Sequence, residues 1–299
     1  GIGTVLGAMW PRTHSFMSGA ERIPHLAKVA QDKGVTIYTE TKGTEIIVDG
    51  SGNVIGAKAE QIDGTQITVN TTKGVVLATG GYCANPAMVK QYDQYWGDDL
   101  SDRTLSTNMG TNEGDGIVMA QAIGADVTGM EIAQMMPSSS PVKGTMTDGI
   151  WADAAEQIWI DGNGNRFVNE YAERDVLAKS SLALEDGIFY IIYAGRGDVG
   201  NPDQLIKGTD YSERIAPMVE GGHIWYGETL AELAEASKTK AAGVAPGFTE
   251  EQLRATIEKY NSYVAAQKDD DYGKEVLAGA IDLEYIEATE GVGICISPR

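Results

Sequence analysis

The sequence contains few cysteines, few histidines and no long apolar run, and each shortage excludes a class of protein. Cys83 and Cys295 lie far apart, so they provide neither a metal-ligand spacing nor a disulfide framework. No apolar run approaches the roughly 20 residues that a membrane-spanning helix needs. His14 and His25 have no partner at ligand spacing, and His223 has the setting of an ordinary polar contact. The sequence therefore predicts no metal site and no membrane segment.

Basic residues are also scarce, with 23 Lys and Arg against 43 Asp and Glu and a net charge of -20. This acidic balance argues against nucleic acid and anionic membranes as partners. A hydrophobic content of 42% and a charged content of 22% are typical of a soluble globular protein. The chain begins with Gly1 and without a signal peptide, so we expect it to be processed or cut from something longer. The compartment stays open between the cytoplasm and the bacterial periplasm or cell surface.

Glycine is abundant, and the 37 glycines separate short predicted elements in the first part of the chain. Apolar residues from Ile23 to Ala30 have helical spacing, and Gly34 is placed to end that helix. Residues 35–39 are predicted to form a strand. An antiparallel meander is predicted next, because Asp-Gly turn sequences separate three segments of strand composition at residues 44–49, 54–60 and 66–70.

Two glycine-containing turns suggest contact with a ligand. Residues 74–81 read as a short apolar strand that ends in Thr79, Gly80 and Gly81, where backbone amides could approach a phosphate or flavin. An ordinary strand and turn is the alternative. A Gly-Asp-Gly sequence centred on Asp115 opens a predicted helix that stops at Gly124. Asp115 could equally serve only to cap that helix and complement its dipole.

The second half centres on residues 158–175. An apolar run, a turn at residues 161–164 and a second extended run lead toward a helix that carries Arg174. The Arg174 fork suits a carboxylate or a developing oxyanion, although it could simply pair with Asp175 or Glu170 on a solvated surface. Further on, a capping box opens a helix at Thr249. The triple aspartate at residues 269–271 is expected to be a solvated turn rather than a calcium site.

The residues of these motifs also resemble the signature of a known family. Residues 166–170 read Arg-Phe-Val-Asn-Glu, and Arg174-Asp175 follows after three residues. This pattern resembles the signature of the flavin-dependent fumarate reductase and succinate dehydrogenase flavoprotein family, especially its soluble branch with flavocytochrome fumarate reductase and urocanate reductase. The Ala-Thr-Gly-Gly turn at residues 78–81 and the Gly-Asp-Gly turn around Asp115 are similar to turns that contact FAD in that family.

The resemblance implies a mixed α/β fold. Residues 1–125 would form the later part of an FAD-binding domain of the two-dinucleotide-binding type, and residues 126–299 an α+β substrate-capping domain. Family members begin with a Gly-x-Gly-x-x-Gly segment that holds the FAD pyrophosphate, and this sequence has none. We therefore expect this chain alone to hold FAD weakly or not at all. The implied cofactor contacts are Thr44, Thr79, Gly80, Gly81 and Asp115.

The implied activity is reduction of the activated C=C bond of an unsaturated carboxylic acid. FAD would supply the hydride and Arg174 the proton, with an electron donor such as a haem or FMN domain or protein. A ketosteroid dehydrogenase-like or aspartate oxidase-like flavoenzyme, or a non-catalytic domain that binds a small acid, stays open as an alternative.

The sequence departs from the family at the implied substrate contacts. Met136 stands where fumarate reductases carry a histidine, and Gly149 and Ile150 replace a Thr-Glu pair. The arginine of the family's proton relay falls at Asp153. Because methionine cannot hold a carboxylate as an imidazolium does, we expect a larger or more apolar pocket than a dicarboxylate site, with fumarate itself a poor substrate.

Overall fold

The computed structural model describes residues 2–3, 13–14, 19–100, 104–137, 154–184, 187, 189–193, 220, 224–227, 229–238, 247–281, 283 and 286–290. The fold is mixed α/β, as expected. The chain divides into two compact units, Gly1–Val76 and Leu77–Arg299, and each is described by itself. The expected boundary near residue 125 stays a prediction. No helix in these described ranges is both long and apolar enough to cross a bilayer.

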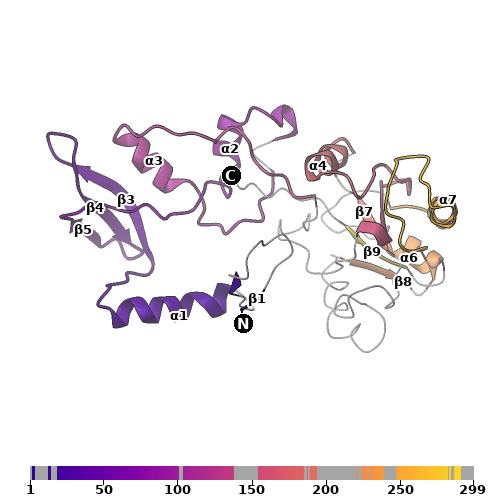
Figure 1. Ribbon diagram of the computed structural model, residues 1–299, viewed down its shortest axis with the longest axis horizontal. Helices are drawn as coiled ribbons and strands as arrows, with labels where there is room; N and C mark the ends of the chain where they lie inside the picture. Colours follow the sequence, from indigo (N-terminus) through magenta and orange to yellow (C-terminus); the bar gives the residue numbers. More distant parts are fainter. Residues whose placement is uncertain are drawn as a thin grey trace. The chain divides into compact units, whose positions relative to one another are not determined.

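The first unit contains a helix and an antiparallel meander, as predicted (Figure 1). Helix α1 (Gly19–Asp32) begins earlier than expected, so Pro24 lies inside it rather than in its first turn. Gly34 follows with a φ of +86°, as a helix-ending glycine requires. The meander has the order β3-β4-β5, with β3 (Thr41–Val48), β4 (Val54–Gln61) and β5 (Gln66–Asn70). A short antiparallel pair, β1 (Ile2–Gly3) and β2 (Thr13–His14), completes the described strands of this unit.

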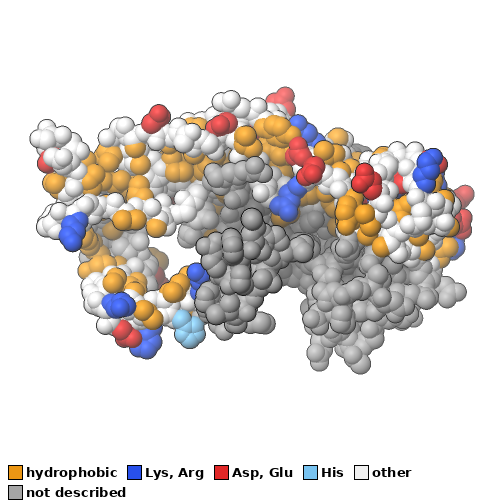
Figure 2. Space-filling view, in the orientation of Figure 1, with side chains coloured by type: hydrophobic (Ala, Val, Ile, Leu, Met, Phe, Trp, Pro, Cys, Tyr) orange, Lys and Arg blue, Asp and Glu red, His pale blue; other side chains and the backbone are white. Residues whose placement is uncertain are grey.

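Two predicted strands are wrong. Residues 35–39 and 74–81 form no strand, and Val76 is 90% exposed. A strand exists only through hydrogen bonds to a neighbour, and no backbone N–H of residues 75–81 donates to another described residue. Figure 2 shows that apolar side chains are exposed elsewhere on the described surface as well. Apolar composition alone therefore does not make these residues strands, because the pairing that a strand needs is not present among the described residues.

One part of the second unit is built from short helices around a compact apolar cluster. Its helices are α2 (Pro86–Tyr92), η1 (Gly97–Asp99) and α3 (Asp115–Ala122). The cluster joins Tyr82, Trp96 and Met135 to Ala178 of α4 (Arg174–Leu182). The predicted helix at Asp115 is confirmed, with Gly114 in the left-handed region just before it.

The other part of the second unit is a sheet buried on both faces. Its order is β6-β7-β9-β8, all antiparallel, with β6 (Gln157–Ile160), β7 (Tyr190–Tyr193), β9 (Ile286–Glu290) and β8 (Ile224–Gly227). The 3-10 turn η2 (Ala154–Glu156) leads into β6. Ile158 and Ile160 pack against α6 (Leu230–Ala236) and α7 (Glu250–Ala266), whereas Trp159 faces the side that includes Leu177 of α4. Alternation along the strand thus places helices on both faces (Figure 1).

The turn at residues 161–164 and the capping box at Thr249 are confirmed and pack together. Gly164 has a φ of +82°, and Ile160 bridges Arg166 across the turn. The side chain of Thr249 accepts from the N–H of Gln252, whose side chain returns the contact at the start of α7. A Cβ at Gly164 would lie 3.2 Å from the Cβ atoms of Gln252 and Phe248. Turn and helix therefore meet where only glycine fits.

We expect Gly164→Ala to lower the free energy of unfolding by more than Gly273→Ala. Both residues have positive φ, a conformation that costs an alanine about 1–2 kcal/mol. Only Gly164 has neighbouring side chains that a methyl group must displace, since nothing lies within 4 Å of a Cβ at Gly273. Urea unfolding followed by tryptophan fluorescence measures both variants. Equal losses would show that the packing at Gly164 adds nothing.

Candidate functional site

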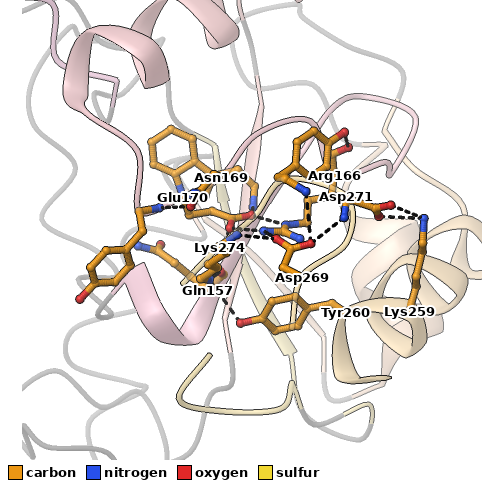
Figure 3. Close-up of polar contacts among 12 residues, drawn as sticks. Gln157, Arg166, Asn169, Glu170, Lys259, Tyr260, Asp269, Asp271 and Lys274 are labelled. Carbon is orange, nitrogen blue, oxygen red and sulfur yellow. Dashed lines mark hydrogen bonds and ion pairs between the residues drawn. The ribbon is translucent and has the colours of Figure 1, made fainter. Parts of the chain in front are cut away.

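The centre of the second unit is an ion pair removed from solvent (Figure 3). Nε of Arg166 lies 2.7 Å from Oε1 of Glu170, and its Nη2 lies 2.8 Å from Oε2, with side-chain exposures of 5% and 0%. Oε1 also accepts the backbone N–H of Trp159 on β6 at 3.0 Å. Burial opposes the charged guanidinium, but the hydrogen bonds and charge of Glu170 outweigh it, so the pKa of Arg166 is raised. The pair therefore holds residues 166–170, which follow the turn, against β6.

A second acid and base come from the turn after α7. Asp269 accepts Nη2 of Arg166 at 2.8 Å, and Nζ of Lys274 lies 3.4 Å from Glu170. Burial alone would raise the pKa of Asp269, but the hydrogen bonds from Arg166 and from backbone N–H groups outweigh burial, so the pKa of Asp269 is lowered. The pKa of Lys274 is also lowered, because burial opposes its charged form. The expectation of a fully solvated turn at residues 269–271 was therefore wrong for Asp269. Two acids and two bases make the cluster neutral, which is how charges are accommodated in an interior.

Aromatic side chains complete this cluster. The rings of Tyr260 and Tyr272 lie 5.3 and 5.2 Å from the guanidinium carbon of Arg166, and Tyr272 donates its hydroxyl to the Arg166 carbonyl at 2.7 Å. Lys274 donates to the carbonyl of Gln157 at 2.7 Å and to the Tyr260 hydroxyl at 3.2 Å. The cluster therefore ties β6, α7 and the turn after α7 to one arginine, beside a small hollow of ≈ 310 Å³ that Arg166, Tyr260 and Tyr272 help to line.

Arg174, the predicted catalytic residue, lies just beyond this cluster. Glu173 is the N-cap of α4 and Arg174 is its first residue, with an exposed side chain. Arg174 lines an open hollow of ≈ 780 Å³. Its other walls are Tyr95 and Trp96, residues 132–135, and further residues of the range 171–177. The start of α4 therefore presents a cation to a space large enough for a small organic acid.

The alternative that Arg174 pairs with Glu170 or Asp175 is wrong. Glu170 is held by Arg166 and Lys274, and Oδ2 of Asp175 accepts the hydroxyl of Tyr95 at 2.6 Å. Within the part of the chain that the structure describes, the Arg174 guanidinium makes no hydrogen bond or ion pair. The cation is therefore available to a ligand.

The wall opposite α4 is fixed by two buried side chains that donate to backbone carbonyls. Tyr82 donates to Met130 at 2.7 Å, and the Trp96 indole donates to Ala133 at 2.7 Å. Gln134 and Met135 line the hollow, whereas Met136, predicted as a substrate contact, is partly buried and is not part of its described lining. Gly149 and Ile150, the other two predicted substrate contacts, lie outside the described residues, as does Asp153.

Most of the predicted cofactor contacts come together in the second unit. A Cβ at Gly116 would lie 2.0 Å from Oγ1 of Thr79, and one at Gly80 would lie 2.8 Å from Oδ1 of Asn112. The 79–81 turn thus abuts the first turn of α3, which carries Asp115. The backbone N–H groups of Gly80 and Gly81 donate to no other described residue, so this turn offers unpaired amides and a nearby carboxylate, which suit a phosphate and a hydroxyl of FAD. Thr44 lies exposed on β3 of the first unit.

Sequence reasoning missed two parts of the site. The contribution of Asp269 and Lys274 has no local signal, because both residues meet Arg166 and Glu170 across roughly a hundred positions of the chain. The Tyr95–Asp175 contact spans 80 positions and was equally invisible. Among the described residues, no group of three or more His, Cys, Asp and Glu could hold a metal ion.

Known proteins resemble this chain over most of its length. A family model described as FAD binding domain matches residues 4–287. The chain is 32% identical over 289 residues to an NADH:acrylate oxidoreductase of Vibrio harveyi, a match covering 95% of this chain and 27% of the relative. It is 30% identical over 255 residues to a urocanate reductase of Eggerthella lenta, covering 84% of this chain and 39% of the relative.

A solved structure agrees with these relatives. The open conformation of a flavocytochrome c3 fumarate reductase matches with a TM-score of 0.73 and 26% identity, covering 99% of this chain and 48% of that one. The chain therefore spans between about a quarter and a half of the length of these three proteins.

We expect Glu170→Gln to lower the free energy of unfolding by about 3–5 kcal/mol, because it leaves the buried charges of Arg166 and Lys274 without their shared partner. Glu250→Gln is the matched control, since Glu250 and Arg254 form the same i,i+4 pair on the surface of α7 and such pairs contribute at most about 1 kcal/mol. Chemical denaturation of the two variants makes the comparison. Similar losses would mean that the buried pair contributes no more than a surface pair.

Proposed function

Because the chain belongs to the FAD binding domain family, we propose that it supplies cofactor contacts and a substrate pocket to a flavin-dependent reductase. The reaction is reduction of the activated C=C bond of an unsaturated carboxylic acid. FAD, the cofactor of this family, supplies the hydride when bound. Thr79, Gly80, Gly81 and Asp115 are the residues of the second unit that would hold it, and the role of Thr44, in the first unit, stays a prediction.

The observation that carries this proposal is the Arg174 guanidinium, which is exposed in the hollow at the start of α4 and pairs with no described residue. A guanidinium keeps its charge at neutral pH and presents a fork that matches a carboxylate. Arg174 is therefore placed to orient the carboxylate of the substrate. As proton donor it protonates one carbon of the C=C bond, while the other carbon receives the hydride. A fixed cation that stabilises growing negative charge is the second role open to it.

The lining of the hollow supports an acid with a single carboxylate and an apolar or aromatic body. Arg174 is the cation in the described lining, and the acids Glu173 and Asp175 stand beside it. A second carboxylate on the substrate would meet these acids rather than another cation. Ile132, Tyr95 and Tyr171 are exposed and provide apolar and aromatic surface instead. This lining favours an enoate that is larger than fumarate.

Electrons must reach the flavin from elsewhere. We propose a haem-bearing or FMN-bearing domain or protein as the donor. The relatives support this proposal in two ways: the matched structure is named as a flavocytochrome, and the Vibrio harveyi relative is named as an NADH-dependent oxidoreductase. Each relative is also longer than this chain, so it has room for such a domain.

When Arg174→Gln and Arg174→Lys are made in the intact enzyme, both variants should still bind FAD. Substrate reduction should slow by roughly a hundredfold or more in each. Glutamine removes charge and acidity, and lysine removes the bidentate fork. Steady-state turnover with a reduced dye measures the loss, and a solvent isotope effect on the residual rate indicates the proton-donor role. Arg254→Gln, at an exposed arginine of α7, is the control and should turn over normally. Near-normal turnover in Arg174→Gln would contradict both roles and return Arg174 to an ordinary surface residue.

The enzyme should reduce a larger or aromatic monocarboxylic enoate at least ten- to a hundredfold more efficiently than fumarate. The described lining holds no second cation for the other carboxylate of fumarate, and a charged hydrogen bond contributes about 1.5–3 kcal/mol. The ratio kcat/KM for fumarate, acrylate and cinnamate derivatives tests this order. Fumarate turnover equal to that of the best acid in the panel would show that the pocket accommodates two carboxylates.

A further inference from the structure

Asp175 is the carboxylate that could compete with a substrate for Arg174. The two residues are neighbours in the first turn of α4, both are exposed, and both line the same hollow. An acid beside a substrate-binding cation can repel an incoming carboxylate or pair with the cation itself. The contacts of the Asp175 carboxylate therefore affect how well Arg174 can bind the carboxylate of a substrate.

Tyr95 provides that hold. Its hydroxyl donates to Oδ2 of Asp175 at 2.6 Å, the short distance typical of a bond to an ionised acceptor. This hydrogen bond is the main reason that the pKa of Asp175 is lowered, with a smaller contribution from Lys179 one turn along α4. Nζ of Lys179 also lies 4.0 Å from the centre of the Tyr95 ring. Asp175 is thus engaged by Tyr95 rather than by Arg174.

The position of Tyr95 is itself built by its neighbours. Asp93 accepts the backbone N–H of Tyr95 at 3.3 Å and that of Trp96 at 2.9 Å. The Trp96 ring lies edge-on to Tyr95 at 4.9 Å, and its indole is anchored to Ala133. The hydroxyl of Tyr95 is therefore held at Asp175 by packing, although the ring is 42% exposed.

We propose that Tyr95 is a positioning residue that determines affinity for anionic substrates. By binding the Asp175 carboxylate, it keeps that acid from pairing with Arg174 and leaves the guanidinium free for the carboxylate of an unsaturated monocarboxylic acid. This inference rests on the proposed role of Arg174 in binding the substrate.

The test measures the dissociation constant of trans-cinnamate for the oxidised, FAD-loaded enzyme by titration calorimetry. Tyr95→Phe removes only the hydroxyl, and it should weaken binding roughly two- to fivefold, the scale of one exposed ion pair. Asp175→Asn removes the competitor and should not weaken binding. The double variant should bind as Asp175→Asn does, because without the carboxylate the hydroxyl has nothing to restrain. Cinnamamide, which carries no charge, should bind the wild type and Tyr95→Phe equally.

A spectroscopic measurement excludes a merely structural role. The carbon-13 signal of the Asp175 carboxyl should titrate at a higher pH in Tyr95→Phe than in the wild type. Unchanged cinnamate binding in Tyr95→Phe would overturn the inference, as would a double variant that stays as weak as Tyr95→Phe. Arg174→Gln separates the two proposals. If it weakens cinnamate binding while Tyr95→Phe does not, only the inference fails; if it leaves binding unchanged, the proposed substrate site fails and the inference falls with it.

Discussion

The ion pair between Arg166 and Glu170 is the contact on which the second unit depends. It joins the residues after the turn to β6 through the N–H of Trp159, and it reaches the turn after α7 through Asp269 and Lys274. None of these four charges is stable in the interior without the others, since an unpaired buried ion costs several kcal/mol. The cluster therefore specifies one arrangement of segments that are far apart along the chain. Arg174 lies four residues after Glu170, so this cluster of charges helps to set the position of the helix that carries it.

The same contact explains why Arg174 is free. Glu170 lies four residues before Arg174 and would be its natural partner on an exposed helix, but Arg166 and Lys274 already hold it. Helix α4 then packs through Ala178 on one apolar cluster and through Leu177 on another, which leaves its first turn at the hollow. Among the described residues Arg174 has no ion-pair partner, because structural contacts occupy Glu170 and Asp175. The site therefore depends on the contacts that hold Glu170 and Asp175 as well as on the residues that line the hollow.

Local features could be predicted from sequence, and long-range partners could not. The capping box at Thr249 and the turn before Arg166 form because residues within four positions satisfy one another. The strands predicted at residues 35–39 and 74–81 were wrong for the opposite reason. A strand needs a hydrogen-bonded neighbour that is often distant in sequence, and composition does not identify that neighbour. In the candidate site, the resemblance identified Arg174, and the structure showed that it is exposed in a hollow. Asp269 was misread as solvated, because its partner Arg166 lies about a hundred positions away.

The buried amine of Lys274 has a further consequence. A lysine is ordinarily the most readily labelled side chain of a protein, yet this one is 2% exposed and its Nζ is surrounded by Glu170, Gln157 and Tyr260. An acylating reagent can reach it only while the segment after α7 is detached from β6. The rate at which Lys274 is labelled, relative to the surface lysines, therefore reports how often this part of the native chain opens. The charge cluster thus contains its own chemical probe of local unfolding.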